Sequence, residues 1–351
     1  MSAVKARGKR GLWYGQCLRI IEQKGRRIPL RVKIILINIT LVIVGLSAGL
    51  FLSEILLRIL QPNSVFGAAD QLPWMDEAVR TKRFMIDPDL GFRPVTGGQF
   101  YNEYGTRVND YSLNKRPGVA RLLFIGDSIT SRGMIIEGLK KLYGEDKFEY
   151  WNGGVESFNT AQEIQFYNKY NYNIRPDHVI LTFCLNDFTA TPVVFFDQKG
   201  QLIVYAPRMS GARINYFLFK KSRLYRFCLG CFIVFKNGER TIDNTIAQEV
   251  RDDLGALKEE LDRARVALTV LIAPALSAYE DWSSADKEAK ATVEKILKER
   301  KIRYFDLSLA LPGAVEEKIN MRSRPEDQVH PGAEMGRYLA GYLYRNNLLE
   351  E

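Results

Sequence analysis

From about residue 120 onward, short apolar runs alternate with longer stretches that have helical periodicity. The strand-like runs are residues 121–125, 148–151, 178–183, 267–273 and 302–306. The helix-compatible stretches are residues 130–143, 160–173, 246–265 and 284–300, and a last one runs from Glu334 to Tyr344. Strands that alternate with helices predict an α/β domain, in which a parallel sheet carries helices on both faces.

A separate apolar stretch precedes this pattern, at residues 34–53. It contains no charged side chain and has the length that a helix needs to cross a bilayer. The alternative is a cleaved signal peptide, which has a shorter apolar region and a small-residue cleavage site. Because this stretch is longer and continues into Glu54-Ile-Leu-Leu-Arg58, we expect one uncleaved transmembrane helix.

The positive charge of the chain is concentrated in its first 33 residues. This arm has ten Lys or Arg residues and one acid, Glu22, so its net charge is +9, and the whole chain is also +9. Residues 34–351 are therefore neutral in sum. A basic arm beside a membrane span predicts a cytoplasmic N-terminus and an extracytoplasmic domain. A nucleic-acid-binding arm is the alternative, but the adjoining span argues against it, and we expect no nucleic-acid partner.

The rest of the chain divides by composition. Residues 54–83, with Pro62 and Pro73, are expected to form a linker, and residues 84–351 the folded domain, which begins with turn-rich pieces up to residue 120. Residues 191–245 are the least regular part, and we expect an insertion or lid there. Its aromatic side chains are candidates to line an acyl or glycan pocket, to touch the membrane surface, or to pack in an ordinary core.

Cysteine usage implies no disulfide framework, since the chain has only Cys17, Cys184, Cys228 and Cys231. Cys228-Leu-Gly-Cys231 has the spacing of a redox motif or half a zinc site, but zinc requires two further ligands. A local disulfide and two small apolar residues in a hydrophobic segment remain as alternatives. Without a ligand cluster or a phosphate-binding glycine loop in the sequence, we expect no metal and no cofactor.

Two short segments carry candidate chemistry. Ser128 stands in Gly126-Asp127-Ser128 directly after an apolar run, and Asp327-Gln-Val-His330 lies near the end of the chain. A serine hydroxyl becomes a nucleophile only when a base takes its proton, and a third group must orient that base. The chain has only two histidines, and His178 leads into a predicted strand, which makes it the poorer candidate. The sequence therefore predicts a serine hydrolase.

Further blocks in the same order strengthen this hypothesis. Asn152-Gly153-Gly154 follows the run at 148–151, and Leu185-Asn186-Asp187 follows the run at 178–183. With Gly126-Asp127-Ser128 and Asp327-Gln-Val-His330 they make four ordered blocks. In these residues the chain resembles the SGNH (GDSL-type) hydrolases, in particular their membrane-anchored bacterial type, over roughly residues 84–348.

This resemblance implies a flavodoxin-like sheet and a set of roles. Ser128 is the implied nucleophile, His330 the base, and Asp327 the residue that orients His330. The implied oxyanion donors are the Ser128 and Gly154 N–H groups and the Asn186 side-chain amide. The Gly-x-Ser-x-Gly elbow of α/β-hydrolases is absent. One position departs from the family pattern, since Cys184 replaces the glycine usual two residues before the asparagine, which puts the oxyanion geometry in question.

The leading functional hypothesis is a membrane-anchored, extracytoplasmic esterase that removes an acyl group, such as O-acetyl, from a cell-envelope or exported polysaccharide. The same residues fit a polysaccharide O-acetyltransferase, in which a sugar hydroxyl replaces water. A lysophospholipase or thioesterase would take a lipid or thioester substrate instead. A non-enzymatic glycan-binding scaffold is a fourth hypothesis. The sequence identifies no protein partner and no oligomeric state.

Overall fold

The computed structural model describes residues 30–60, 79, 81–196, 202–205, 216–236, 242 and 244–349. The chain forms two compact units, Met1–Pro62 and Asn63–Glu351. The predicted basic arm, except its last residues, lies outside the described part, as do Cys17 and most of the predicted linker and of residues 197–215.

The first unit contains one long helix, α2 (Leu30–Leu60), with no buried side chain. By length and composition it is able to cross a membrane, as predicted for residues 34–53. It extends further at its C-terminal end than the apolar stretch does. There Arg58 pairs with Glu54 at 2.7 Å, one turn earlier, an arrangement that stabilises helices. The start of the predicted linker is therefore helical.

The second unit is built on a five-stranded sheet. Its strands, in spatial order, are β4 (Phe148–Asn152), β3 (Ala120–Gly126), β5 (His178–Cys184), β8 (Ala267–Ala273) and β9 (Arg303–Asp306). Every neighbouring pair is parallel. Each strand overlaps one of the five predicted apolar runs, so the predicted parallel sheet is confirmed. The spatial order corresponds to the flavodoxin-like arrangement 2-1-3-4-5.

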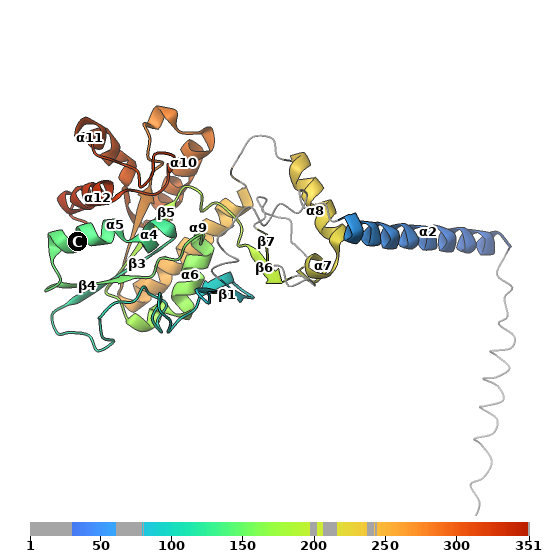
Figure 1. Cartoon of the computed structure of the whole chain (residues 1–351), viewed down its shortest axis with the longest axis horizontal. Coiled ribbons are helices and arrows are strands. Elements are labelled where there is room, and N and C mark those ends of the chain that lie inside the picture. Colours follow the sequence, from blue (N-terminus) through green and yellow to red (C-terminus); the bar gives the residue numbers. More distant parts are fainter. Residues whose placement is uncertain are drawn as a thin grey trace, which may run out of the picture. The chain divides into compact units, whose positions relative to one another are not determined.

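Helices cover both faces of this sheet (Figure 1). The longer ones are α5 (Met134–Tyr143), α6 (Thr160–Lys169), α9 (Asn244–Ala264), α10 (Ser284–Glu299) and α12 (Ala333–Arg345). The shorter ones are α4 (Ser128–Arg132), α11 (Leu311–Glu316) and the 3₁₀ turns Asn171–Ile174, Tyr279–Asp281 and Leu307–Ala310. The chain crosses from β3 to β4 in one direction and from β4 to β5 in the other. Right-handed crossovers then put α5 and α6 on opposite faces, where α12 packs on α5 and α9 on α6.

The central strands are fully enclosed. Every residue of β5 is buried, and in β3 only Ala120 is partly exposed. Strands that are covered on both faces have continuous apolar sequences, which is why the pattern at residues 121–125 and 178–183 does not alternate. The enclosed sheet holds the ends of β3 and β5 in fixed register, with Gly126 opposite Thr182.

The chain reverses its winding direction between β3 and β5. In open α/β sheets the carboxyl ends of the strands at such a point leave a crevice, and ligands bind there. Ser128 follows β3 and Asn186 follows β5, so two of the predicted site residues lie on either side of this point.

The turn-rich segment before β3 forms a hairpin of β1 (Phe84–Asp87) and β2 (Gly91–Pro94). Its apolar side chains join a second core with residues that follow β4 and with α6. This core comprises Phe84, Leu90, Phe92, Tyr101, Val155, Phe158, Phe166 and Val194. Gly91 has φ +73°, and a Cβ there would lie 2.1 Å from the Pro192 carbonyl oxygen. The hairpin thus supports the loop that carries Gly154.

The segment predicted as an insertion or lid lies between β5 and α9. The described parts are the antiparallel pair β6 (Val193–Phe196) and β7 (Leu202–Tyr205) and the helices α7 (Tyr216–Lys221) and α8 (Arg223–Lys236). Cys228 and Cys231 lie on α8 as exposed free thiols, so the structure contains no disulfide between them. Whether this segment acts as a lid stays a prediction.

A buried ion pair connects β3 and β4 near their amino-terminal ends. Arg121 on β3 donates from Nε to Glu149 Oε2 on β4 at 2.8 Å, and both side chains are 1% exposed. The other Arg121 nitrogens donate to the carbonyls of Ile174, Ser112 and Leu113. These bonds connect β3 with the segments on either side of it.

Glu149→Ala is expected to lower the free energy of unfolding by about 3–5 kcal/mol, because it leaves a buried guanidinium without its counter-charge. Arg116→Gln is the matched control. Arg116 contacts the same carboxylate at 3.2 Å but is half exposed, so its loss should cost about 1 kcal/mol or less. Denaturant unfolding of both variants tests the difference, and equal losses would contradict it.

Candidate active site

Ser128 is the first residue of α4, directly beyond the carboxyl end of β3. The turn is tight, because Gly126 has φ +153° and a Cβ there would lie 2.3 Å from Thr130 Oγ1. Asp127 caps the helix, since its Oδ1 accepts the Ile129 N–H at 2.9 Å. Ser128 Oγ lies 3.4 Å from Asp127 Oδ2, and the side chain is partly exposed at the helix N-terminus.

The loop before α12 brings the predicted base to Ser128. His330 Nε2 lies 2.8 Å from Ser128 Oγ, across 202 residues of chain. On the other side of the ring, His330 Nδ1 lies 2.9 Å from Asp327 Oδ1 and 2.8 Å from Oδ2. The structure therefore places the three side chains in one hydrogen-bonded row. A carboxylate only accepts, so Nδ1 carries the proton and the Nε2 lone pair faces the serine hydroxyl.

The loop geometry keeps Asp327 ionised. Its Oδ1 accepts the backbone N–H groups of Val329 and His330 at 3.1 Å and 3.0 Å. Partial burial acts to raise the pKa of Asp327, but these N–H groups and the His330 ring outweigh it and hold that pKa well below its usual range. A permanently ionised Asp327 can stabilise a protonated His330.

Two of the three predicted oxyanion donors have free hydrogen atoms. Within the described residues, the Ser128 N–H has no hydrogen-bond partner, and neither has the Asn186 side-chain amide, which is exposed. Ser128 opens α4 and Asn186 follows the adjacent strand β5, so both stand at the same edge of the sheet. This arrangement is compatible with the roles implied for them, which stay predictions.

The third predicted donor is engaged. The Gly154 N–H donates to the side-chain Oδ1 of Asn152 at 3.0 Å, so it serves an oxyanion only if that bond is shared or exchanged. The position does require glycine, since a Cβ on Gly154 would lie 2.3 Å from the Ser131 nitrogen. Gly154 is therefore required for packing, because its loop approaches α4 closely. The sequence pattern alone did not separate this steric requirement from a role as an oxyanion donor.

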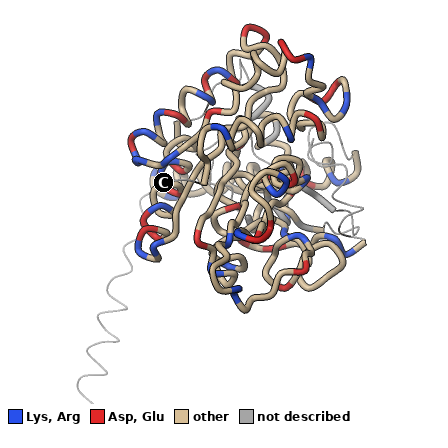
Figure 2. Tube along the Cα trace, turned by 90° about the vertical axis from the view of Figure 1, so that its left-hand side faces the viewer, with Lys and Arg blue, Asp and Glu red and all other residues tan. Residues whose placement is uncertain are grey.

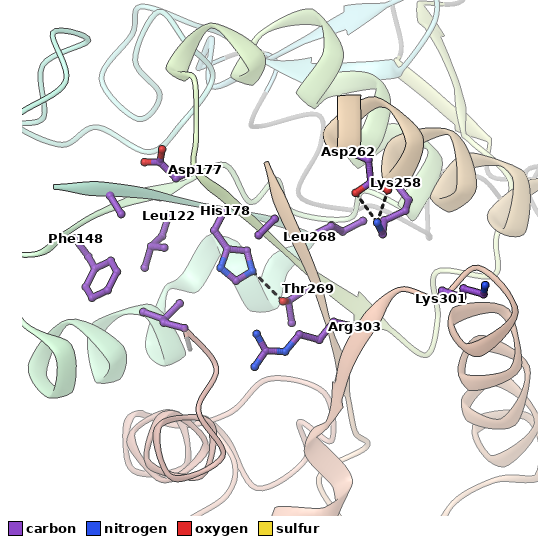
Figure 3. Close-up of a pocket in the computed structure, with 13 residues that line it drawn as sticks. Leu122, Phe148, Asp177, His178, Lys258, Asp262, Leu268, Thr269, Lys301 and Arg303 are labelled. Atoms are coloured by element: carbon purple, nitrogen blue, oxygen red, sulfur yellow. Dashed lines mark hydrogen bonds and ion pairs between the residues drawn. The ribbon is translucent and has the colours of Figure 1, made fainter. Parts of the chain in front are cut away.

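His178 is the first residue of β5 and lies at the amino-terminal end of the parallel strands, opposite the end that carries Ser128 (Figure 3). Its Nε2 is 2.9 Å from Thr269 Oγ1, beside an open cavity of about 660 Å³ that is also lined by Arg303, Lys301 and Lys258. Burial, with the Arg303 charge, lowers the pKa of His178 to about 4, so the ring is neutral at physiological pH. Ser128 and Asp327 are remote from it, which excludes His178 as their base.

Cys184 is buried, and its thiol stays protonated. Burial and the nearby carboxyl groups of Asp127 and Asp187 raise the pKa of Cys184 well above its usual value. The thiol is therefore no competitor for Ser128 as a nucleophile. The Asp127 carboxyl is near enough for its charge to contribute to this shift.

Three buried carboxyl groups gather behind the nucleophile, a feature that the sequence did not suggest. Asp127, Glu163 and Asp187 are each 2–3% exposed. Asp187 Oδ2 accepts from the Cys184 N–H at 2.9 Å, whereas neither Glu163 oxygen has a hydrogen-bond partner in the part of the chain that the structure describes. Burial, and then the charges of Asp187 and Asp127, raise the pKa of Glu163 well above its usual value. Burial, and then the charge of Asp127, also raise the pKa of Asp187 well above its usual value, so the enclosed cluster favours protonated carboxyl groups.

The pKa shift of Glu163 has a consequence for stability. A carboxyl whose pKa is higher in the folded state favours folding at low pH, and this contribution is lost as the pH rises toward the folded pKa. Glu163→Gln, which cannot ionise, is expected to match the wild type near pH 4.5 and to become progressively more stable than it above that pH. Thermal unfolding from pH 4.5 to 9 tests this, and a constant difference between the two proteins would contradict it.

Sequence inspection also missed two side chains beside Asp327. Ser323 Oγ donates to Asp327 Oδ2 at 3.0 Å, and Arg132 Nη1 lies 3.6 Å from the same oxygen. Ser323 precedes Asp327 by four residues, but Arg132 lies on α4, 191 residues before Ser323, and no motif connects them.

Comparisons with known proteins give structural neighbours alone. No family model matches the chain, and no curated protein matches it. A catalytic mutant of Axe2, an acetylxylan esterase from Geobacillus stearothermophilus, superimposes with a TM-score of 0.43 at 15% identity, covering 66% of this chain and 95% of Axe2. The acetyl xylan esterase AlAXEase superimposes with a TM-score of 0.40 at 14% identity, covering 64% and 98%.

Among the described residues, no group of three or more His, Cys, Asp or Glu side chains is arranged to hold a metal ion.

Proposed function

We propose that this protein is a membrane-anchored, extracytoplasmic serine esterase of the SGNH type that removes an acyl group, O-acetyl in our hypothesis, from a cell-envelope or exported polysaccharide. The observation that carries the proposal is the row of contacts from Ser128 Oγ to His330 Nε2 at 2.8 Å and from His330 Nδ1 to Asp327 at 2.8 Å. This is the distance at which a base accepts a serine proton.

In the first half of the reaction, Ser128 Oγ attacks the acyl carbonyl carbon while its proton passes to His330 Nε2. The new imidazolium is stabilised by the Asp327 carboxylate, which stays ionised throughout. When the tetrahedral intermediate collapses, the bond to the sugar oxygen breaks, and His330 returns the proton to that oxygen. The sugar leaves as an alcohol, and the acyl group stays on Ser128 as an ester.

In the second half, a water molecule takes the place of the sugar hydroxyl. His330 removes one proton from the water as its oxygen attacks the acyl carbon, and then gives that proton to Ser128 Oγ as the acyl-enzyme bond breaks. The products are a carboxylic acid and the restored enzyme. If a second sugar hydroxyl attacked instead, the same residues would transfer the acyl group.

Charge that develops on the carbonyl oxygen needs donors that are already in place. The free Ser128 N–H at the start of α4 and the exposed Asn186 amide are the available donors, and the helix N-terminus adds a partial positive charge. The Gly154 N–H joins them if its bond to Asn152 is shared.

The location is proposed from α2 and the distribution of charge. The helix is long and apolar enough to cross a membrane, and the arm before it is strongly basic. Beyond the arm the net charge is zero, and Figure 2 shows acidic and basic positions interspersed along the folded domain. The basic arm would therefore stay in the cytoplasm, and the domain would face acylated glycans outside it.

The chemistry is tested by incubating the full chain, in detergent, with a fluorophosphonate probe and, separately, with acetyl esters and O-acetylated polysaccharide. We expect a covalent adduct on Ser128 and release of acetate. A folded protein that neither reacts with the probe nor hydrolyses any ester would refute the proposal. Acetate transfer to a glycan acceptor in place of release would replace hydrolysis by transfer.

The orientation is tested by fusing alkaline phosphatase, which is active only outside the cytoplasm, after Glu351. We expect an active fusion. Replacing the Lys and Arg residues of the arm by Gln should lower its activity several-fold, because these charges hold the N-terminus inside. An inactive fusion on the wild-type chain would show the opposite orientation.

A further inference from the structure

The candidate triad is divided between two separate parts of the fold. Ser128 belongs to α4, whereas Asp327 and His330 lie on a loop without regular secondary structure. The loop is attached to its own side of the domain by the Gln328 carbonyl, which accepts from the Leu276 N–H at 2.7 Å, and by Arg322, which donates to the Leu276 carbonyl. These bonds fix the loop next to β8 but do not fix its distance from α4.

Among the described residues, the polar contacts that join α4 to this loop are three. One is the candidate catalytic contact between Ser128 and His330. The other two come from Arg132, whose Nη1 donates to Ser323 Oγ at 3.2 Å and lies 3.6 Å from Asp327 Oδ2. Ser128 and Arg132 are four residues apart on α4, so their side chains extend from the same face of the helix.

Ser323 is the centre of this connection. Its hydroxyl accepts from Arg132 and donates to Asp327 Oδ2 at 3.0 Å. Its backbone N–H donates to the His330 carbonyl at 3.1 Å. One residue therefore contacts both ends of the Asp327–His330 segment and the helix that carries the nucleophile.

The contacts close a ring. It runs from Ser128 along α4 to Arg132, across to Ser323 and Asp327, through the His330 ring and back to Ser128. In a ring of this kind each contact restricts the others, so the separation of Ser128 Oγ and His330 Nε2 is restrained from both sides. An error of about 1 Å in such a separation can cost a hundred-fold in rate.

We propose that Arg132 and Ser323 are positioning residues, which hold the Asp327–His330 loop against the helix of the nucleophile. Arg132 also partly neutralises the Asp327 carboxylate, and Ser323 donates a hydrogen bond to it. This inference rests on the proposed esterase function for its kinetic consequences. Its structural part, the coupling of Arg132 and Ser323 to His330, does not depend on any substrate.

The positive charge of Arg132 lies beside the Asp327–His330 pair and affects the protonation of the His330 ring. The groups that face His330 are Asp327 on its own loop, Asp127 before α4, and Arg132 beyond Asp327. Arg132 offsets part of the Asp327 charge, so its removal should leave His330 beside a stronger anion. Loss of the Arg132 charge is therefore expected to favour the protonated form of the His330 ring.

The test uses the full chain in detergent with Arg132→Gln, Arg132→Lys and Ser323→Ala. Arg324→Gln is the matched control, since it removes one positive charge from an exposed position of the same loop. The first readout is the titration of the histidine ring carbons by NMR. The chain has only two histidines, and His178, with its pKa lowered to about 4, remains neutral above pH 5.5 and serves as an internal reference.

We expect the titration curve of the His330 ring to differ from that of the wild type in Arg132→Gln and Ser323→Ala and to coincide with it in Arg324→Gln. Arg132→Lys should restore the wild-type curve, because the charge is kept. In ester hydrolysis, kcat should fall about 10-fold to 100-fold in Ser323→Ala and Arg132→Gln with KM unchanged, since the residues act on the base and touch no substrate. The acid limb of kcat/KM should move to higher pH by the same shift as the titration.

The two proposals fail in different ways. If His330 titrates identically in all four variants and kcat is unchanged, the positioning role is overturned, while labelling of Ser128 would still support the esterase. If the titration shifts as expected but the wild type shows no reaction with probe or ester, the coupling stands and the proposed function falls.

Discussion

Ser128→Ala is expected to abolish ester hydrolysis, with kcat lowered by about six orders of magnitude. The substitution removes the only atom that can form the acyl-enzyme bond, and Cys184 cannot replace it because its buried thiol stays protonated. The helix should persist, since its cap comes from Asp127, whose Oδ1 accepts the Ile129 N–H. KM should change little, because the hydroxyl contributes to the transition state more than to substrate binding.

The measurement is steady-state hydrolysis of an acetyl ester by wild type and variant at equal concentration, with the fluorophosphonate adduct as an independent readout. Ser131→Ala is a suitable control, because it removes a hydroxyl from the same helix that, among the described residues, makes no hydrogen bond with His330. A Ser128→Ala protein with more than about 1% of wild-type activity would mean that a different group is the nucleophile.

The sheet was predictable because its signal is local. Each strand is centred on a short apolar or aromatic run, and β5 is buried along its whole length, so burial and sequence pattern coincide. The strand order and the hairpin of β1 and β2 depend on contacts that local periodicity does not encode. The extension of α2 to Leu60 was missed because Glu54 and Arg58 interrupt the apolar stretch but pair with each other on the helix.

For the site, the sequence indicated the residues whose types are rare or ordered along the chain. The chain has two histidines, so there were only two candidates for the base. The structure places Nε2 of His330, the predicted one, 2.8 Å from Ser128 Oγ. Arg132 and Ser323 were not predicted, because their contact spans 191 residues and neither type is unusual on a surface. Glu163 was missed for the opposite reason. Glutamate is rarely buried without a partner, so no pattern suggests that it is enclosed beside Asp187.

Asp327→Asn is expected to lower kcat by about four orders of magnitude while leaving the fold intact. The reason lies in the hydrogen bonds of Asp327. Its Oδ1 accepts two backbone N–H groups, so the single oxygen of an asparagine would keep that position. The amide NH₂ would then occupy the position of Oδ2, facing His330 Nδ1, and would donate to it. The ring would have to carry its proton on Nε2, toward Ser128, where it cannot accept the serine proton.

This prediction has a direct spectroscopic test, because the tautomer of His330 can be read from the nitrogen chemical shifts of its ring. We expect Nδ1–H in the wild type and Nε2–H in Asp327→Asn, with kcat and the tautomer changing together. Alanine at this position offers neither an acceptor nor a donor to Nδ1. Asp327→Ala should therefore keep a larger fraction of the Nδ1–H tautomer than Asp327→Asn does, but the His330 ring should be less well oriented. If Asp327→Asn kept the Nδ1–H tautomer and most of its activity, Asp327 would not be the group that orients the base.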